Sequence, residues 1–511
     1  MSPQVTRLAQ AVSPQVARLT RPKKTWQFTA VAATAGMALA AGVVTAAGPW
    51  DSSGQRTAER DYAAARERSG GADHGRDSDT SATAPRPAPS AASVLVGLGG
   101  SANTVKSAPT AGTALSDVLT PLLKNAALGT RHTASVVDVT TGRRLYGVGA
   151  DDALTPASTT KIATAVAALS TLGADHRLTT RTALEPDTKE LVLVGGGDPT
   201  LTAHENDGGT SRSGEAGSGG SWASLRTLAD DTAAALKKRG VREVTLSYDT
   251  TLYAGSELHS IGVNGNLAPV SALMADEGRT DDSTSGPVTR VTDPAADAAR
   301  KFAGFLQDHG IKTTSPGPSK ATGRADTLAT VSSPPLSDLV ERMLTNSDND
   351  IAEALARQTA AATGQRADFA GGASAIAARL KKLQLPLKGA DFHDGSGLDR
   401  DDRLTADLLT ALLVKAGDPA HPELRPVLTG LPIAGFTGTL TSRYTDATGA
   451  AGVVRAKTGT LTGVNTLAGT VVDQDGRLLA FAFLASNTTD PLAAQSALDR
   501  TATALAGCGC S

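Results

Sequence analysis

Ser158 and Lys161, in the run Ser-Thr-Thr-Lys, are a pair whose types and spacing could carry out chemistry. Residues three apart lie on the same face of a helix, so the Lys161 amine can reach the Ser158 hydroxyl. A serine hydroxyl is a weak nucleophile until a base accepts its proton, and a lysine becomes such a base when burial or nearby positive charge lowers its pKa. The pair therefore indicates acyl transfer through serine. Taken alone, it equally fits a helix-capping serine followed by a surface lysine.

A second group, Ser347, Asp348 and Asn349, lies within a segment of helical pattern. The Ser347 hydroxyl could relay a proton, and the Asn349 amide could hold a substrate carbonyl. These residue types also cluster in ordinary turns, so the group has meaning only in combination with the first pair.

A third group, Lys457, Thr458, Gly459 and Thr460, follows an apolar stretch and is predicted on a strand edge. Lys457 and the Thr458 hydroxyl could bind a carboxylate. Glycine at 459 would let a substrate backbone approach, because no side chain blocks the strand. The Thr460 backbone N–H could pair with that of Ser158 as an oxyanion hole. Alone, the run also fits a solvated edge lysine next to a strand glycine.

The elements that must position these groups are predicted at both ends of a long region. Residues 115–128 have the spacing of a helix, residues 133–150 predict a β-hairpin, and residues 154–173 predict a buried helix that begins near Ser158. Residues 453–487 predict successive antiparallel strands, which a helix follows. These elements would form one sheet with helices packed on it. The middle of the chain, with several strands, one amphipathic helix and long polar loops, is interpreted as an insertion.

The order of the three groups is itself informative. Ser-x-x-Lys on a helix, Ser-x-Asn downstream and Lys-Thr-Gly on a late strand are the signature of penicillin-binding proteins and class A β-lactamases. Over about residues 114 to 507 the sequence resembles the class C low-molecular-mass penicillin-binding proteins, a family of D-alanyl-D-alanine carboxypeptidase/endopeptidases. Besides the three groups, the segments that carry the resemblance are 156–169, 193–201, 269–279 and 393–405.

This resemblance implies the fold class: an α+β, multi-domain protein with a β-lactamase/transpeptidase-like fold, in which helices flank an antiparallel sheet. The inserted region would lie between the Ser-x-x-Lys and Ser-x-Asn groups. Ser347 follows Ser158 by 189 positions, whereas β-lactamases place these groups much closer. The spacing therefore favours a carboxypeptidase over a β-lactamase. The resemblance implies that this carboxypeptidase cleaves peptidoglycan peptides, and it leaves open whether endopeptidase activity accompanies it.

The resemblance also implies the catalytic roles. Ser158 would be the acylated nucleophile, and Lys161 would be its base. Ser347 would pass a proton to the leaving D-alanine. Peptidoglycan stem peptides would be the substrates, and β-lactams would acylate the enzyme as inhibitors.

The substrate-binding roles follow in the same way. Asn349 would hold the amide on the acyl side of the substrate. Lys457 with Thr458 would bind the terminal carboxylate, next to Gly459. Thr460 would complete the oxyanion hole.

Two positions depart from the family pattern. Asp399 stands where a small polar residue is expected, and Met274 stands where a small residue is more usual. Neither touches a proposed catalytic atom, but both bear on substrate preference. Ser396, between two glycines, predicts a turn near the site, because the chain contains no G-x-S-x-G nucleophile motif.

Composition excludes several other classes of function. A net charge of −2 gives no sign of nucleic-acid binding, which would need a basic face. The only cysteines are Cys508 and Cys510, so the core has no cysteine metal site, and no H-E-x-x-H pair occurs. We expect neither a metal nor another cofactor. Two alternatives stay open: a β-lactamase or esterase of the same serine–lysine type, and an inactive binding module tethered in the envelope.

The first part of the chain indicates export. Residues 1–26 are basic and are predicted as a cytoplasmic tail, and residues 27–48 are apolar enough for a transmembrane anchor or a cleaved signal. Residues 49–112 have the composition of a disordered linker. The protein is therefore expected in the cell envelope outside the cytoplasm, anchored to the membrane or secreted. The remaining predicted divisions are a catalytic first part, an inserted region, a catalytic second part and a tail: 113–185, 186–335, 336–507 and 508–511.

Overall fold

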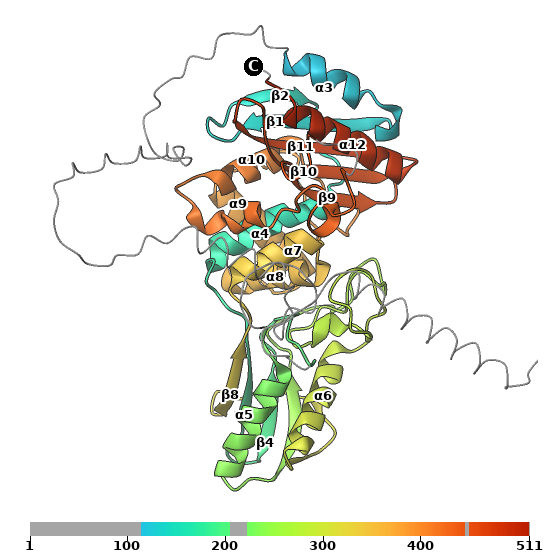
Figure 1. Cartoon of the computed structure of the whole chain (residues 1–511). Coiled ribbons are helices and arrows are strands. Elements are labelled where there is room, and N and C mark those ends of the chain that lie inside the picture. Colours follow the sequence, from blue (N-terminus) through green and yellow to red (C-terminus); the bar gives the residue numbers. More distant parts are fainter. Residues whose placement is uncertain (1–113, 205–221, 445–448, 510–511) are drawn as a thin grey trace, which may run out of the picture. The chain divides into compact units, whose positions relative to one another are not determined.

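The computed structural model describes residues 114–204, 222–444 and 449–509 (Figure 1). The predicted tail, apolar segment and linker, residues 1–112, lie outside this part of the chain. Within the described ranges, no helix is both long enough and apolar enough to cross a membrane.

One sheet is built from both ends of the described chain. It has five strands in the order β2-β1-β11-β10-β9, and every neighbouring pair is antiparallel. The strands are β1 (Arg131–Asp138), β2 (Arg144–Val148), β9 (Arg455–Leu461), β10 (Val464–Val472) and β11 (Leu478–Ser486). β9, which carries the Lys-Thr-Gly group, therefore lies at an edge of this sheet.

Two helices cover one face of the five-stranded sheet (Figure 1). They are α3 (Leu115–Leu123) and α12 (Pro491–Ala506). Phe481 and Phe483 of β11 point into this layer and stack with ring centroids 5.1 Å apart. Burying each such side chain stabilises the fold by roughly 1.5–3 kcal/mol, so this layer holds the central strand firmly.

The intervening residues of β11 face a second layer of helices. Ala480 and Ala482 are fully buried against the cluster that includes α4 (Thr160–Leu172) and α10 (Ala406–Gly417). Their small side chains let these helices pack close to the sheet. Further helices complete the layer: α7 (Leu336–Asn346), α8 (Asn349–Ala362), α9 (Phe369–Lys382) and α11 (Pro426–Thr429).

A second, six-stranded sheet is formed by the middle of the chain. Its order is β6-β5-β4-β3-β8, with β7 paired to β5. The strands are β3 (Thr179–Leu184), β4 (Glu190–Val194), β5 (Glu243–Asp249), β6 (Lys312–Thr313), β7 (Gly317–Pro318) and β8 (Asp326–Ser332). The predicted division between residues 185 and 186 is therefore corrected: β3 pairs with β4 and β8, so the inserted sheet begins at Thr179.

Two helices pack on the inserted sheet, where the sequence indicated one. α5 (Leu225–Lys238) matches the predicted amphipathic helix, and α6 (Pro294–Asp308) is the additional one. The Asp293 side chain caps α6 by accepting the Ala296 N–H, and proline occupies its first position. Leu228, Leu236 and Phe302 are completely buried in the core of this region.

Candidate active site

Ser158 and Lys161 lie together where a short 3₁₀ turn, η3 (Ala157–Thr159), leads into α4. Lys161 Nζ donates to Ser158 Oγ at 3.1 Å. Lys161 is completely buried, so it is not the surface lysine of the alternative interpretation. Ala157 has a φ of +49°, a left-handed conformation that a residue with a side chain rarely adopts. This strained residue directly precedes the half-buried serine, and such strain is common at functional sites.

The Lys161 ammonium has three N–H groups, and each has an acceptor. Besides Ser158, Asn349 Oδ1 lies 2.6 Å away and the Ser396 backbone carbonyl lies 2.7 Å away. Burial lowers the pKa of Lys161 to about 8, although Asp394 and other nearby carboxylates raise it. A lysine with this pKa releases its proton near neutral pH, as a general base must.

The Ser-x-Asn group lies at a break between two helices rather than inside one. α7 ends at Ser347, which has a left-handed φ of +59°, and the Asp348 side chain caps α8 by accepting the Ile351 N–H. The prediction that Ser347 and Asn349 lie within a helical segment is therefore wrong at Ser347, where α7 ends. The break brings Ser347 next to Lys457 while Asn349 contacts Lys161.

Lys457 on β9 is the second buried lysine of the site. Its Nζ donates to Ser347 Oγ at 2.8 Å and to the Thr458 carbonyl at 2.9 Å. Burial and the positive charge of Lys161 lower the pKa of Lys457 well below its usual value. The three groups that lie far apart in the sequence are thus joined by hydrogen bonds in one site.

Thr458 and Gly459 of the Lys-Thr-Gly group make contacts within the protein that the sequence did not predict. The Thr458 hydroxyl donates to Thr439 Oγ1 at 2.9 Å, and Thr460 is exposed on the edge strand. A Cβ on Gly459 would come within 2.1 Å of Thr466 Oγ1 and 2.7 Å of the Pro156 carbonyl. Glycine is therefore required for β9 to pack against the serine turn. The structure thus gives Gly459 a packing role within the protein, in addition to the approach of a substrate backbone expected from the sequence.

Several residues contact the site although no motif in the sequence assigns them a role in it. The Ser396 carbonyl contacts Lys161, Thr439 contacts Thr458, and the Asn266 carbonyl accepts the Asn349 Nδ2–H at 2.8 Å. Only the Gly-Ser-Gly run around Ser396 indicated a turn near the site. Backbone carbonyls have no side-chain signature, so their roles could not be assigned in advance.

Among the residues that the structure describes, two groups of buried side chains have the residue types of metal ligands, with atoms within 4.8 Å of one another: His259–Glu353–Asp394 and Glu277–Asp348–Asp350. In the first group the imidazole hydrogen-bonds to Asp394, and Glu353 accepts a backbone N–H. In the second, arginine guanidinium groups lie next to the carboxylates. Both groups are internally paired networks, and we assign neither as a metal centre.

The inserted region reaches the catalytic helices through buried contacts. Arg290 Nη1 lies 2.9 Å from Asp350 Oδ2, and both side chains are at most 3% exposed. The Ala268 N–H donates to Asp350 Oδ1 at 2.9 Å. Because Asp350 follows Asn349 directly, these contacts brace the start of α8, which carries the Ser-x-Asn group.

Comparison with known proteins gives a consistent result. A model described as the D-Ala-D-Ala carboxypeptidase 3 (S13) family matches residues 115–289 and 280–505. Carboxypeptidase DacB of Mycolicibacterium smegmatis is 38% identical over 407 residues, which is 78% of this chain and 84% of that protein. A carboxypeptidase of Mycobacterium tuberculosis is 36% identical over 437 residues, with 84% of this chain and 90% of that protein covered.

A solved structure resembles the fold. Penicillin-binding protein 4 of Haemophilus influenzae superposes with a TM-score of 0.60 at 21% identity, over 76% of this chain and 98% of that one. The predicted fold class, an antiparallel sheet flanked by helices with an insertion between the first two groups, is confirmed by this likeness and by the sheet order.

Proposed function

The chain belongs to the D-Ala-D-Ala carboxypeptidase 3 (S13) family, and from this premise we propose that it is a serine D-alanyl-D-alanine carboxypeptidase acting on peptidoglycan stem peptides. The observation that supports this most is the pairing of Ser158 with a buried lysine whose Nζ lies 3.1 Å from the hydroxyl. A relative from Actinomadura that is 31% identical is itself named a D-alanyl-D-alanine carboxypeptidase.

Acylation begins with Lys161 as the base. The neutral amine accepts the proton of Ser158, whose Oγ attacks the carbonyl carbon of the penultimate D-alanine. The backbone N–H groups of Ser158 and Thr460 stabilise the oxyanion that forms. Asn349 holds the amide on the acyl side, and it also fixes Lys161 through its Oδ1.

Departure of D-alanine requires a proton on the leaving nitrogen. Ser347 donates that proton, and Lys457, whose Nζ already donates to Ser347 Oγ, replaces it. The substrate carboxylate binds Lys457 and Thr458, beside Gly459. The negative charge of this carboxylate favours the protonated form of Lys457, so substrate binding itself prepares the relay. Water then adds to the acyl carbon, its proton restores Lys457 through Ser347, and the bond to Ser158 Oγ breaks as Lys161 returns its proton to that oxygen, which releases the shortened peptide.

The pH dependence of acylation should report Lys161. Its pKa is about 8, and only the neutral amine accepts the Ser158 proton. The second-order rate of acylation by a labelled penicillin should therefore fall about tenfold per pH unit below the pKa and level off above it. Measuring the rate from pH 6 to 9.5 checks this; a rate that is flat between pH 6 and 8 contradicts a lysine base.

Product analysis separates the proposed activity from its alternatives. Incubation with a stem pentapeptide should release D-alanine, and a cross-linked dimer shows whether endopeptidase activity accompanies it. A β-lactamase would instead hydrolyse penicillin rapidly without accumulating an adduct. Folded protein that binds the pentapeptide without releasing D-alanine would be the inactive binding module.

We place the enzyme in the cell envelope, because peptidoglycan is assembled there and residues 1–48 have an export pattern. Intact mass measurement of the protein from membrane and culture fractions distinguishes an anchored chain from one cleaved near residue 48. The full-length mass, confined to the membrane fraction with the basic tail retained, supports the anchor, whereas a chain shortened near residue 48 in the culture fraction supports cleavage.

A further inference from the structure

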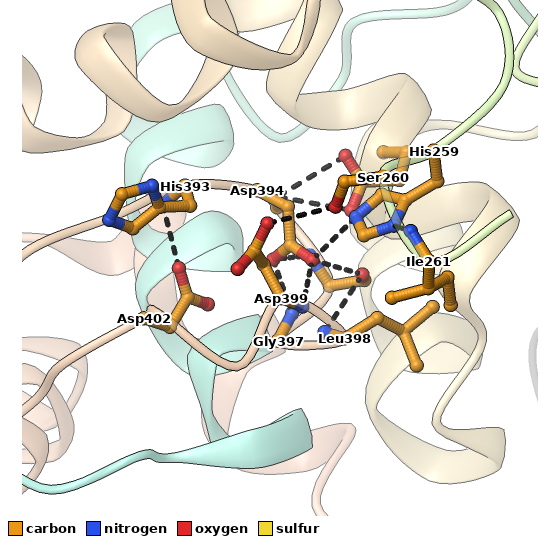
Figure 2. A network of polar contacts seen from close by, with 12 residues as sticks. His259, Ser260, Ile261, His393, Asp394, Gly397, Leu398, Asp399 and Asp402 are labelled. Carbon is orange, nitrogen blue, oxygen red and sulfur yellow. Dashed lines mark hydrogen bonds and ion pairs between the residues drawn. The ribbon is translucent and has the colours of Figure 1, made fainter.

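The loop of residues 393–402 is organised around one buried carboxylate, Asp394 (Figure 2). Its Oδ1 accepts the N–H groups of Ser396 and Gly397, and its Oδ2 accepts the Asp399 N–H and the Ser396 hydroxyl. Burial raises the pKa of Asp394, but hydrogen bonds from His259 and from this backbone outweigh it and hold the pKa below its usual value. The carboxylate therefore fixes the shape of the loop.

Neighbouring elements hold the same loop from outside. Glu353 of α8 accepts the Gly395 N–H at 3.1 Å, and Thr164 of α4 donates to the Gly395 carbonyl at 2.6 Å. A Cβ on Gly397, which has a φ of +83°, would come within 1.9 Å of the Ala157 carbonyl. The loop thus fits between α8, α4 and the serine turn, with no room to shift.

The inserted region contributes His259 to this network, and the neighbouring Ser260 hydroxyl donates to Asp399 Oδ2 at 3.0 Å (Figure 2). The Ile261 N–H donates to His259 Nδ1 at 3.2 Å, which places the proton of the neutral ring on Nε2. His259 Nε2 lies 3.0 Å from Asp394 Oδ2 and donates to it. The imidazole is buried and meets Phe369 edge to face, with centroids 5.0 Å apart. His259 of the inserted region is therefore the donor of this hydrogen bond, and Asp394 of the loop is the acceptor.

This network fixes the position of one backbone carbonyl, that of Ser396. The Ser396 carbonyl and Asn349 Oδ1 are the two shortest contacts of Lys161 Nζ, at 2.7 and 2.6 Å. A neutral amine keeps two N–H groups. When these two acceptors hold them, the lone pair is left facing Ser158 Oγ, where it must accept a proton.

We propose that His259 and Asp394 are positioning residues for the general base: they fix the Ser396 carbonyl, and through it the inserted region aims the lone pair of Lys161 at Ser158. The inference rests on the proposed function, because it assumes that Lys161 acts as the base. The hydrogen-bond partners of Lys161 Nζ are Ser158, Asn349 and Ser396, so His259 and Asp394 act on it through the loop.

The test compares His259→Leu with His259→Gln, using labelled penicillin as the probe. Leucine removes the donor to Asp394, and the acylation rate constant should fall by about a hundredfold while the affinity of the preceding non-covalent complex changes little. Glutamine can place an N–H near the position of Nε2 and should recover most of the rate. His393→Gln, on an exposed histidine of the same loop, is the matched control and should match wild type.

A second variant, Asp394→Asn, tests how the Asp394 carboxylate affects the pKa of Lys161. Lys161 is faced by Asp394 on the loop, by carboxylates on and before α8, and by Lys457 on β9. These carboxylates are Asp348, Asp350 and Glu353. Asp394→Asn removes the largest contribution that raises the pKa of Lys161, so the acidic limb of the acylation profile should move to lower pH. A purely structural role would lower the rate without moving the limb.

The outcomes separate this inference from the proposed function. If wild type forms no adduct, the proposed function fails first. If wild type acylates but His259→Leu stays within threefold of it, the positioning role is wrong. Equal losses in the leucine and glutamine variants, with an unmoved acidic limb in Asp394→Asn, also overturn it. Circular dichroism and thermal unfolding confirm that each variant is folded.

Discussion

Replacing Lys161 with methionine is expected to lower the rate of acylation by about a hundredfold to ten-thousandfold, the usual contribution of a positioned base. Methionine has nearly the length of lysine and suits a completely buried position, so the fold should persist. Lys161→Arg should be equally slow, because a guanidinium keeps its proton at any pH at which the protein is stable. The loss in both variants therefore comes from the missing base and not from the missing charge.

The rate is measured with labelled penicillin at pH 8.5, where the wild-type lysine is largely neutral. Lys415→Met, on the partly exposed surface of α10, serves as the control and should acylate like wild type. A folded Lys161→Met protein that acylates within threefold of wild type would show that another group accepts the Ser158 proton.

Replacing Arg290 with methionine is expected to destabilise the protein by about 3–5 kcal/mol at neutral pH, because it leaves a buried carboxylate without its partner. Arg290 Nη1 lies 2.9 Å from Asp350 Oδ2 and also donates to the Glu277 carbonyl. Burial already raises the pKa of Asp350 to about 6, although Arg290 lowers it, so the variant raises that pKa further. A carboxyl group with a higher pKa in the folded state takes up protons on folding. The loss of stability should therefore shrink as pH falls from 8 to 5.

Urea unfolding of wild type and variant across this pH range measures the effect. Arg239→Met is a matched control, because Arg239 and Asp326 are also 2.9 Å apart but are about half exposed. Removing that surface pair should cost at most about 1 kcal/mol. Equal losses in the two variants, or a loss at Arg290 that grows toward pH 5, would contradict the role given to the buried pair.

The chemical groups of the site could be predicted from the sequence because each is a short run of side chains in a required order. Ser158, Lys161, Ser347 and Lys457 are recognisable by type, and the patterns around them predict the helix and the edge strand that carry them. The strand-rich pattern of residues 453–487 likewise predicts the antiparallel strands to which β11 belongs.

Other features depend on contacts between distant segments and have no local signature. The left-handed break at Ser347 interrupts a run that is helical in pattern on both sides. Gly459 is required by the approach of Thr466 and Pro156, which lie far from it in the sequence. Thr179–Leu184 has the pattern of a strand of either sheet, and only its pairing assigns it to the insertion. The hydrogen bonds of backbone carbonyls to Lys161 are invisible in the sequence for the same reason.

The most direct test of the central claim is to locate the residue that penicillin acylates. Wild-type protein is treated with a labelled penicillin, digested and mapped by mass spectrometry, and Ser158→Ala is treated in parallel. The account predicts one covalent adduct, on the peptide that contains Ser158, and none in the variant. An adduct on another residue, or an adduct that persists in folded Ser158→Ala, would contradict it.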